Sequence, residues 1–225
     1  ALFTTDNNAL YDPDPLQSIR NARKQGALIQ HNHPGWRRTS CDKTEFEVKA
    51  YNEGLIDGIE IANGGSLYLP IIDRAREENL FVAANTDIHP TTAEYYRLKG
   101  QLRNMTLVLA KECTLKGIRE ALEAKRSLAM SGGYVCGDEQ LLKDLFLASI
   151  KYEVVSTDKK GTRTVRITNM YSIPYQYKTS KNALPVDLLP YHSIQINVAK
   201  DKKLNLTLTN LLCGANKSPK VTLEL

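Results

Sequence analysis

The stretch Gln30-His31-Asn32-His33-Pro34-Gly35-Trp36 decides how the first part of the chain is organised, and Asn85-Thr86-Asp87-Ile88-His89-Pro90 repeats its pattern downstream. Each stretch follows a short apolar run typical of a buried strand and ends in a proline that stops the strand. In an α/β barrel, the carboxyl ends of the parallel strands form the active face. Histidine nitrogens and aspartate oxygens at such ends are suitable ligands for Zn²⁺, Mn²⁺ or Fe. The spacing indicates a metal site, and ordinary loop histidines are an equally open interpretation.

The residues around these two stretches alternate between helical and strand-like patterns as far as residue 131. Asp14 followed by Pro15 predicts a helix start, and Gly26 suits the left-handed position that ends a helix. Further helices are predicted over 44–51, 69–79 and 114–125, the last with an inward stripe of Leu115, Ile118, Ala121 and Leu122. Strands are predicted over 27–30, 55–63, 80–84, 105–110 and 127–131. Helices that alternate with strands are typical of an α/β fold.

Glu60 is the one acidic residue inside the apolar part of its predicted strand, where it lies between two isoleucines. A carboxylate flanked by buried positions needs a partner. That partner is either a metal ion or a neighbouring arginine or lysine, and the sequence does not choose between them. After the strand 80–84 we expect a polar loop that includes Tyr95 and Tyr96.

The pattern changes near residue 140, and beyond Leu141 the sequence predicts no long helix. Short alternating strands are predicted instead over 150–156, 162–169, 175–179, 193–198, 203–210 and 221–225. Asp158-Lys159-Lys160-Gly161 is expected to form the hairpin turn between the first two. Strands of this number and spacing fit an antiparallel β-sandwich of immunoglobulin type. We therefore expect two domains, residues 1–140 and 141–225, the second acting as a structural or interaction module.

Positive charge is concentrated in the last third of the chain. The net charge is +5 overall, yet residues 151–225 hold 12 basic and 5 acidic residues, a balance of 12 − 5 = +7. Such a module could attract an anionic surface or polymer, although a solvated lysine-rich surface is the favoured interpretation. The basic residues are dispersed and lack interleaved aromatic side chains, which disfavours nucleic acid as a partner.

Composition excludes several other classes of protein. The chain has 225 residues, 42% of them hydrophobic, which is enough for one large domain or two modest ones. No apolar run approaches the roughly 18 residues of a membrane-spanning helix. The four cysteines are scattered without a C-x-x-C pair, so free thiols are favoured over a zinc ribbon or a redox motif.

Residues 27–36, 57–64 and 85–89 together resemble the polymerase and histidinol phosphatase (PHP) family of metal-dependent phosphoesterases. The segment 114–127 is similar to the last barrel helix of that family, so the resemblance covers about residues 10–135. It implies an α/β fold with a partial, distorted (βα)7 TIM-like barrel, followed by an all-β immunoglobulin-like sandwich as in two-domain bacterial members. The first His-x-His motif, the second motif and the bridging glutamate of the family are not found here.

The resemblance also implies roles for particular residues. His33 resembles the metal ligand of the third family motif, and Asp87 and His89 resemble those of the fourth, which makes these three the expected catalytic and metal-binding residues. Complete sites hold two or three divalent ions, Zn, Mn or Fe, and a metal-activated water hydrolyses a phosphate mono- or diester. His31, one pleat from His33 on the same strand face, is expected to support a metal ligand from behind, to bind the metal in its place, or to bind substrate. Arg37 and Arg38 could bind the phosphate, or could be two exposed loop arginines.

The missing motifs lead to expectations about partners. The chain resembles the back half of a barrel, so we expect it to be completed by the upstream half of the same barrel or by another copy. The expected substrate is a phosphorylated small molecule or a nucleotide. The alternative is a non-catalytic binding or scaffold protein, with a relic barrel and an interaction β-sandwich. The compartment stays open, with a lean to the bacterial periplasm or cell envelope.

Overall fold

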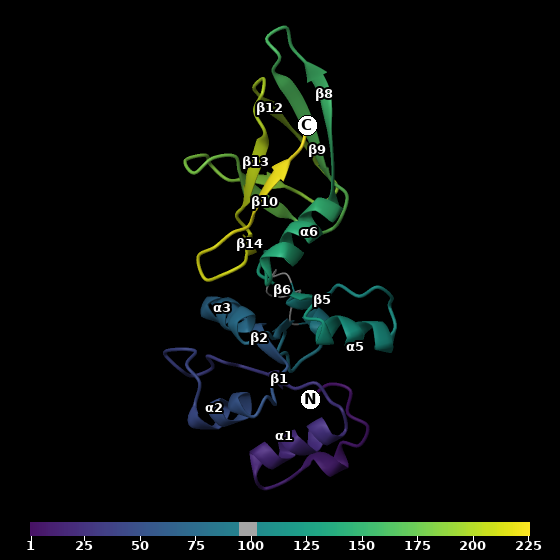
Figure 1. The fold of residues 1–225 in the computed structure, drawn as a ribbon, viewed down its shortest axis with the longest axis vertical. Helices are drawn as coiled ribbons and strands as arrows, with labels where there is room; N and C mark the ends of the chain where they lie inside the picture. The colour runs from purple at the N-terminus through teal and green to yellow at the C-terminus, as the bar shows by residue number, and fades with distance from the viewer. Residues whose placement is uncertain (95–102) are drawn as a thin grey trace. The chain divides into compact units, whose positions relative to one another are not determined.

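The computed structural model describes residues 1–94 and 103–225, which form two compact units, Ala1–Gly132 and Gly133–Leu225 (Figure 1). The first unit mixes helices and strands, as predicted, and the second consists mainly of strands. The loop residues Tyr95 and Tyr96 lie outside the described part of the chain. In the described residues, no helix is both long and apolar enough to cross a membrane. The four cysteines are free, as predicted.

The helices and strands of the first unit follow the predicted alternation closely. Its helices are η1 (Asn8–Leu10), α1 (Pro15–Lys24), α2 (Glu45–Asn52), α3 (Leu69–Glu77) and α5 (Leu115–Glu123). Its strands are β1 (Gln30–His31), β2 (Gly58–Asn63), β3 (Ser66–Leu67), β4 (Phe81–Asn85), β5 (Met105–Val108) and β6 (Ser127–Ser131). The predicted strands are longer than the observed ones at several ends, because apolar residues continue into the turns.

Side-chain caps explain where the helices begin. Asp14 accepts a hydrogen bond from the backbone N–H of Leu16 at the start of α1, and Thr114 accepts one from Gly117 at the start of α5. Leu115 was expected on the inward stripe of α5, but it is 73% exposed. Helical side chains lean toward the N-terminus of their helix. At the first position of α5 the side chain of Leu115 therefore has no preceding turn of its own helix to cover.

Three parallel strands form the centre of the first unit. β2 lies between β1 and β4, and all of its residues are buried. Gly58 of β2 faces Phe81 of β4 in the register, and a Cβ atom at Gly58 would overlap the Phe81 ring. The β2–β4 register shifts between Glu60 and Ala62, which marks a β-bulge at the level of Glu60. Bulges re-aim side chains and are frequent next to functional sites.

Side-chain hydroxyls form hydrogen bonds with the backbone N–H and carbonyl groups on the other edge of β4. Ser127 Oγ accepts from the N–H of Val82 at 3.0 Å and donates to the carbonyl of Val82 at 2.8 Å. Thr106 Oγ1 forms the same pair of bonds with Ala84, at 3.0 and 3.2 Å. Since β5 and β6 pair with each other in antiparallel fashion, these hydroxyls connect them to the parallel strands.

The second unit contains two antiparallel sheets. One has the strand order β12–β9–β8 and the other has the order β11–β10–β13–β15. The strands of the unit are β7 (Tyr134–Cys136), β8 (Ile150–Thr157), β9 (Arg163–Asn169), β10 (Tyr175–Lys178), β11 (Val186–Leu188), β12 (Ser193–Val198), β13 (Leu204–Leu208), β14 (Leu211–Leu212) and β15 (Lys220–Leu223). The hairpin turn predicted at 158–161 joins β8 to β9, with Gly161 in the left-handed region at φ 81°.

The prediction that no long helix follows Leu141 is wrong, because α6 spans Glu139–Ser149. The predicted domain boundary after residue 140 falls within this helix. Asp138 caps α6 by accepting from the N–H groups of Gln140 and Leu141. Leu142 and Phe146, four positions apart, are fully buried on one face. In Figure 1 this helix lies at one end of the strands of the second unit.

Tyr175 connects α6 to the strand β10. Its ring packs edge-on against Phe146, with centroids 5.0 Å apart, and its hydroxyl donates to Ser149 Oγ at 2.8 Å. Burial raises the pKa of Tyr175 to about 12. We expect Tyr175→Phe to lower the free energy of unfolding by about 1 kcal/mol, because the ring contact stays and one buried hydrogen bond is lost. Urea denaturation would measure this, with Tyr191→Phe at an exposed site as the control. Equal stability of the two variants would contradict a role for the hydroxyl.

Candidate functional site

Glu60 lies at the centre of the site, fully buried on β2. One carboxylate oxygen accepts from the side-chain amides of Asn63 at 3.1 Å and Asn85 at 2.6 Å. The other accepts from the backbone N–H of His33 at 2.7 Å. His33 follows β1, Asn63 ends β2 and Asn85 ends β4, so one carboxylate holds together the ends of three parallel strands. Its hydrogen-bond donors among the described residues are neutral, so neither an arginine nor a lysine is its partner.

The imidazole of His33 lies against the same carboxylate. Nδ1 is 3.0 Å from Glu60 Oε2, and it is a buried atom that lacks a well-directed hydrogen bond within the described residues. At this distance Nδ1 faces the carboxylate, but the contact lacks the direction of a hydrogen bond. With Nδ1 turned toward Glu60, Nε2 is the ring nitrogen left to bind a ligand. A carboxylate beside a histidine in this way commonly orients it toward a metal.

Asp87 and His89 lie beyond the end of β4. Asp87 Oδ1 is 4.0 Å from His89 Nε2, and both side chains are exposed, at 48% and 91%. The structure therefore brings Asp87 and His89 together, and pairs His33 with Glu60 instead. Among residues 1–94 and 103–225, no three His, Cys, Asp or Glu side chains lie close enough to hold a metal.

Strain marks two of the three predicted ligands. His33 and Asp87 have left-handed backbones, with φ of 53° and 48°. For His33 the strain is greater, since it precedes Pro34, and a following proline favours an extended conformation. Backbone strain in non-glycine residues is concentrated at functional sites.

Tyr68 is a common neighbour of these strand ends. Burial raises the pKa of Tyr68 most, a hydrogen bond with Ser66 lowers it, and the negative charges of Glu60 and Asp87 raise it further. A Cβ atom at Gly35 would come within 2.9 Å of the Tyr68 ring. The Tyr68 ring therefore lies against the loop after β1.

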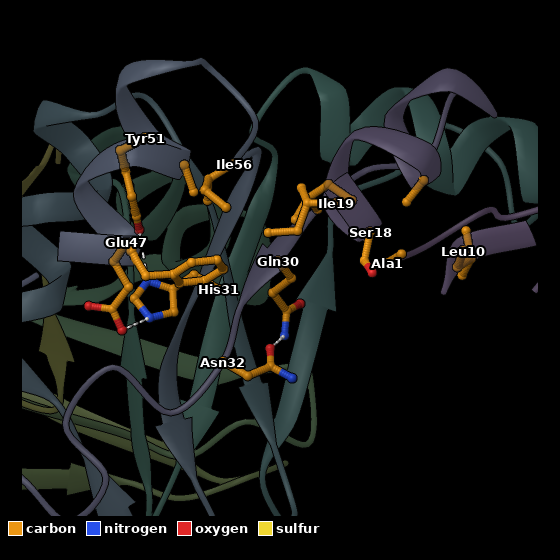
Figure 2. A pocket seen from close by; sticks show the side chains of 14 residues that line it. Ala1, Leu10, Ser18, Ile19, Gln30, His31, Asn32, Glu47, Tyr51 and Ile56 are labelled. Carbon is orange, nitrogen blue, oxygen red and sulfur yellow. Dashed lines mark hydrogen bonds and ion pairs between the residues drawn. The ribbon is translucent and has the colours of Figure 1, made fainter. Parts of the chain in front are cut away.

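His31 belongs to a second cluster, formed with α2 (Figure 2). Its Nε2 is 3.1 Å from Glu47 and its Nδ1 is 3.0 Å from the hydroxyl of Tyr51. Burial is the main cause that lowers the pKa of His31, which favours the neutral ring. The argument that His31 and His33 share a strand face does not apply. β1 ends at His31, and the left-handed backbone of His33 breaks the alternation.

The carboxylate of Glu47 contacts Arg38 as well as His31. Burial alone would raise the pKa of Glu47, but the hydrogen bonds from Arg38 and from the N–H of Thr44 lower it overall. Arg38 donates to both Glu47 oxygens, at 3.0 and 3.1 Å, and to the carbonyl of Asp42. The Arg38 guanidinium therefore connects the first turn of α2 to the segment that precedes this helix.

Arg37 differs from Arg38 in being exposed. Its guanidinium lies 4.5 Å from the centre of the exposed Trp36 ring. The Trp36 ring is in turn 6.3 Å from the ring of His33. Of the two arginines predicted to bind phosphate, Arg37 therefore has its charged group on the same surface as His33.

A cavity of about 350 Å³ lies beside the His31 cluster. Its walls are apolar side chains of α1 and α2 together with Leu10, Ile29 and Ile56. Its polar lining includes His31, Glu47 and the hydrogen-bonded pair Gln30–Asn32 (Figure 2). The apolar walls suit a hydrophobic group better than a phosphate.

Comparison with known proteins identifies the class of protein to which this chain belongs. No protein-family model matches the chain, and no curated protein matches it. The chain is 31% identical to a two-domain protein of Bacteroides vulgatus that contains a predicted PHP-like metal-dependent phosphoesterase. The similarity covers 99% of this chain and 69% of that one, with a TM-score of 0.90. The chain therefore belongs to the family of two-domain proteins with a PHP-like phosphoesterase domain, which supports a metal-dependent hydrolase as its general kind.

Sequence reasoning missed several residues of the site. Glu60 was noticed but left out of the site, and Asn63, Asn85 and Glu47 were not considered. The sequence does point to Asn63 and Asn85, because each asparagine stands at the end of an apolar strand. The sequence also points to Glu47, because it is the third residue after Thr44 and forms a capping box with it.

Proposed function

We propose that this chain is the metal-binding part of a phosphoesterase that hydrolyses a phosphate mono- or diester. His33, Asp87 and His89 are the proposed ligands of two or three divalent ions. The observation that supports this most is the buried Glu60 carboxylate, which faces His33 and accepts hydrogen bonds from neutral groups.

The charge of Glu60 is the physical reason. A nearby cation stabilises a buried carboxylate, because the charge of the carboxylate is costly to remove from water. A divalent ion on Nε2 of His33 would place positive charge on the far side of the ring from Glu60. The imidazole and carboxylate donors present here fit Zn²⁺, Mn²⁺ or Fe²⁺.

The remaining ligands are proposed to come from residues outside this sequence, either in an upstream half of the same barrel or in another copy. We further propose that the first unit is the later part of a distorted seven-stranded barrel and the second unit an immunoglobulin-like sandwich. The parallel strands β1, β2 and β4, with the candidate site at their carboxyl ends, support the first assignment. The two antiparallel sheets support the second.

The residues of this chain would have different roles in the proposed reaction. The metal, when bound, supplies a water of lowered pKa and neutralises phosphate oxygens. Glu60 keeps His33 oriented. Arg37 is placed to donate to a phosphate, since a guanidinium matches its oxygens in a bidentate way. The substrate is a phosphorylated small molecule or a nucleotide.

The test uses the full-length gene product, measured for bound metal and for turnover of chromogenic phosphate mono- and diesters. We expect His33→Ala and Asp87→Ala to lose metal and to lower turnover by more than about 100-fold, since even changes around ligands cost 10–100-fold. His192→Ala is the control, because the side chain of this exposed histidine bonds only to the carbonyl of Pro190 among the described residues. Full turnover in Asp87→Ala would overturn the proposal.

A non-catalytic binding protein is the second candidate. It is favoured by the lack of any three-donor cluster within the described residues. Full-length protein that holds no metal and turns over neither ester would support this candidate.

A further inference from the structure

The second unit carries a groove of about 710 Å³ on the sheet formed by β10, β13 and β15. Three lysines line it, Lys178, Lys181 and Lys220, and its other polar lining is hydroxyl and amide groups such as Thr207, Thr222 and Asn205. The segment that follows β10, residues 179–181, also contributes to the lining. No acidic or aromatic side chain of the described residues lines this groove.

The strand register explains why the lysines lie together. Lys178 of β10 faces Thr207 of β13, which faces Lys220 of β15. Residues opposite each other on neighbouring strands share a face of the sheet. The next position along β10, Tyr177, is buried and faces the buried Leu208, so the lysine row is on the solvent side. Strands are about 4.8 Å apart, which places the backbones of Lys178 and Lys220 roughly 10 Å apart.

The groove has three lysines and, among the described residues that line it, no acidic residue to balance them. Elsewhere Arg166 pairs with Glu153 and Lys203 pairs with Glu224. None of the three groove lysines forms an ion pair with an acid in the described part of the second unit. Asp187, the acidic residue of β11, is hydrogen bonded to Gln176. Three cations thus surround a hollow that holds no anion of the protein, which makes the hollow attractive to an anionic ligand.

We propose that this groove binds an anionic polysaccharide, with the lysines contacting its carboxylates or sulfates. Threonine hydroxyls and the Asn205 amide can exchange hydrogen bonds with sugar hydroxyls. Single-stranded nucleic acid is disfavoured because its binding sites stack bases on aromatic rings. The row Lys178–Thr207–Lys220 offers two charges separated by a hydroxyl, which suits a chain that carries acidic groups at intervals along a hydroxyl-rich backbone. This inference concerns a different unit from the proposed metal site and does not depend on it.

Binding would be measured by titration calorimetry on the whole protein, with heparin, polygalacturonate and neutral dextran as probes. We expect binding to a polyanion and not to dextran, and the stronger of the two polyanions shows whether sulfate or carboxylate is preferred. The triple variant Lys178→Gln, Lys181→Gln, Lys220→Gln should weaken binding on the order of tenfold, since each exposed ion pair contributes up to about 1 kcal/mol.

The matched control removes the same charge from the β8–β9 hairpin with Lys151→Gln, Lys159→Gln and Lys160→Gln. This control should retain the affinity of the unmodified protein. Equal weakening by both triple variants would show diffuse charge attraction and overturn the proposal, as would no binding to either polyanion. Single-stranded DNA that binds more tightly than both glycans, and depends on the groove lysines, would overturn the choice of ligand. Because Lys181 and Lys220 are exposed and Lys178 is partly exposed, the groove variant should melt at the same temperature as the unmodified protein.

Discussion

Glu60→Ala is expected to destabilise the first unit by about 3–5 kcal/mol, because three buried donors lose their common acceptor. The change removes the acceptor shared by the His33 backbone and the amides of Asn63 and Asn85. Each donor left unpaired in a buried place costs about 1–3 kcal/mol, and the three costs are not fully additive. Guanidinium denaturation followed by circular dichroism would measure the loss.

The control for this substitution is Glu77→Ala, at an exposed position at the end of α3. Glu77→Ala should change stability by less than about 0.5 kcal/mol, as is usual for surface positions. A second variant, Glu60→Gln, separates stability from metal binding. It keeps the size of the side chain and removes its charge, so folded Glu60→Gln protein should bind metal about 10–100-fold more weakly. Unchanged metal affinity in that variant would contradict the role of Glu60 in orienting His33.

Gly58→Ala is expected to cost about 3 kcal/mol, at the upper end of what overpacking usually costs. The added methyl group would overlap the ring of Phe81 on the neighbouring strand, and both residues are buried in the centre of the parallel strands. Neither β2 nor β4 can move aside, because Glu60 and Asn85 connect them. The midpoint of thermal unfolding would show the effect.

Gly65→Ala is the control for Gly58→Ala, because no atom lies within 4 Å of the added Cβ atom at Gly65. The double variant Gly58→Ala, Phe81→Leu should recover part of the loss, since a leucine leaves room for the methyl group. If Gly58→Ala alone were as stable as Gly65→Ala, the close packing of Gly58 on Phe81 would be contradicted.

Much of the first unit could be predicted because its signals are local. Asp14 and Thr114 cap helices through residues two or three positions away, and such caps are visible in a short window of sequence. The helix α6 was missed because its apolar face is short and lies where strand-like patterns begin. Leu142 and Phe146 carried the helical spacing that predicts it.

The candidate site was harder to predict, because its contacts join distant parts of the chain. Asn85 and His33 lie 25 and 27 positions from Glu60. The sequence left open whether the partner of Glu60 is a metal, an arginine or a lysine. The register of β2 on β4 also shifts next to Glu60, and a single sequence does not reveal such a shift.

The left-handed backbones of His33 and Asp87 have a consequence for the evolution of this protein. A residue with a Cβ atom loses roughly 1 kcal/mol or more in that conformation, and glycine does not. A gene copy released from selection for activity would gain stability by replacing either residue with glycine, and would drift in that direction. Retention of both a histidine at position 33 and an aspartate at position 87 would therefore distinguish working genes from decaying ones.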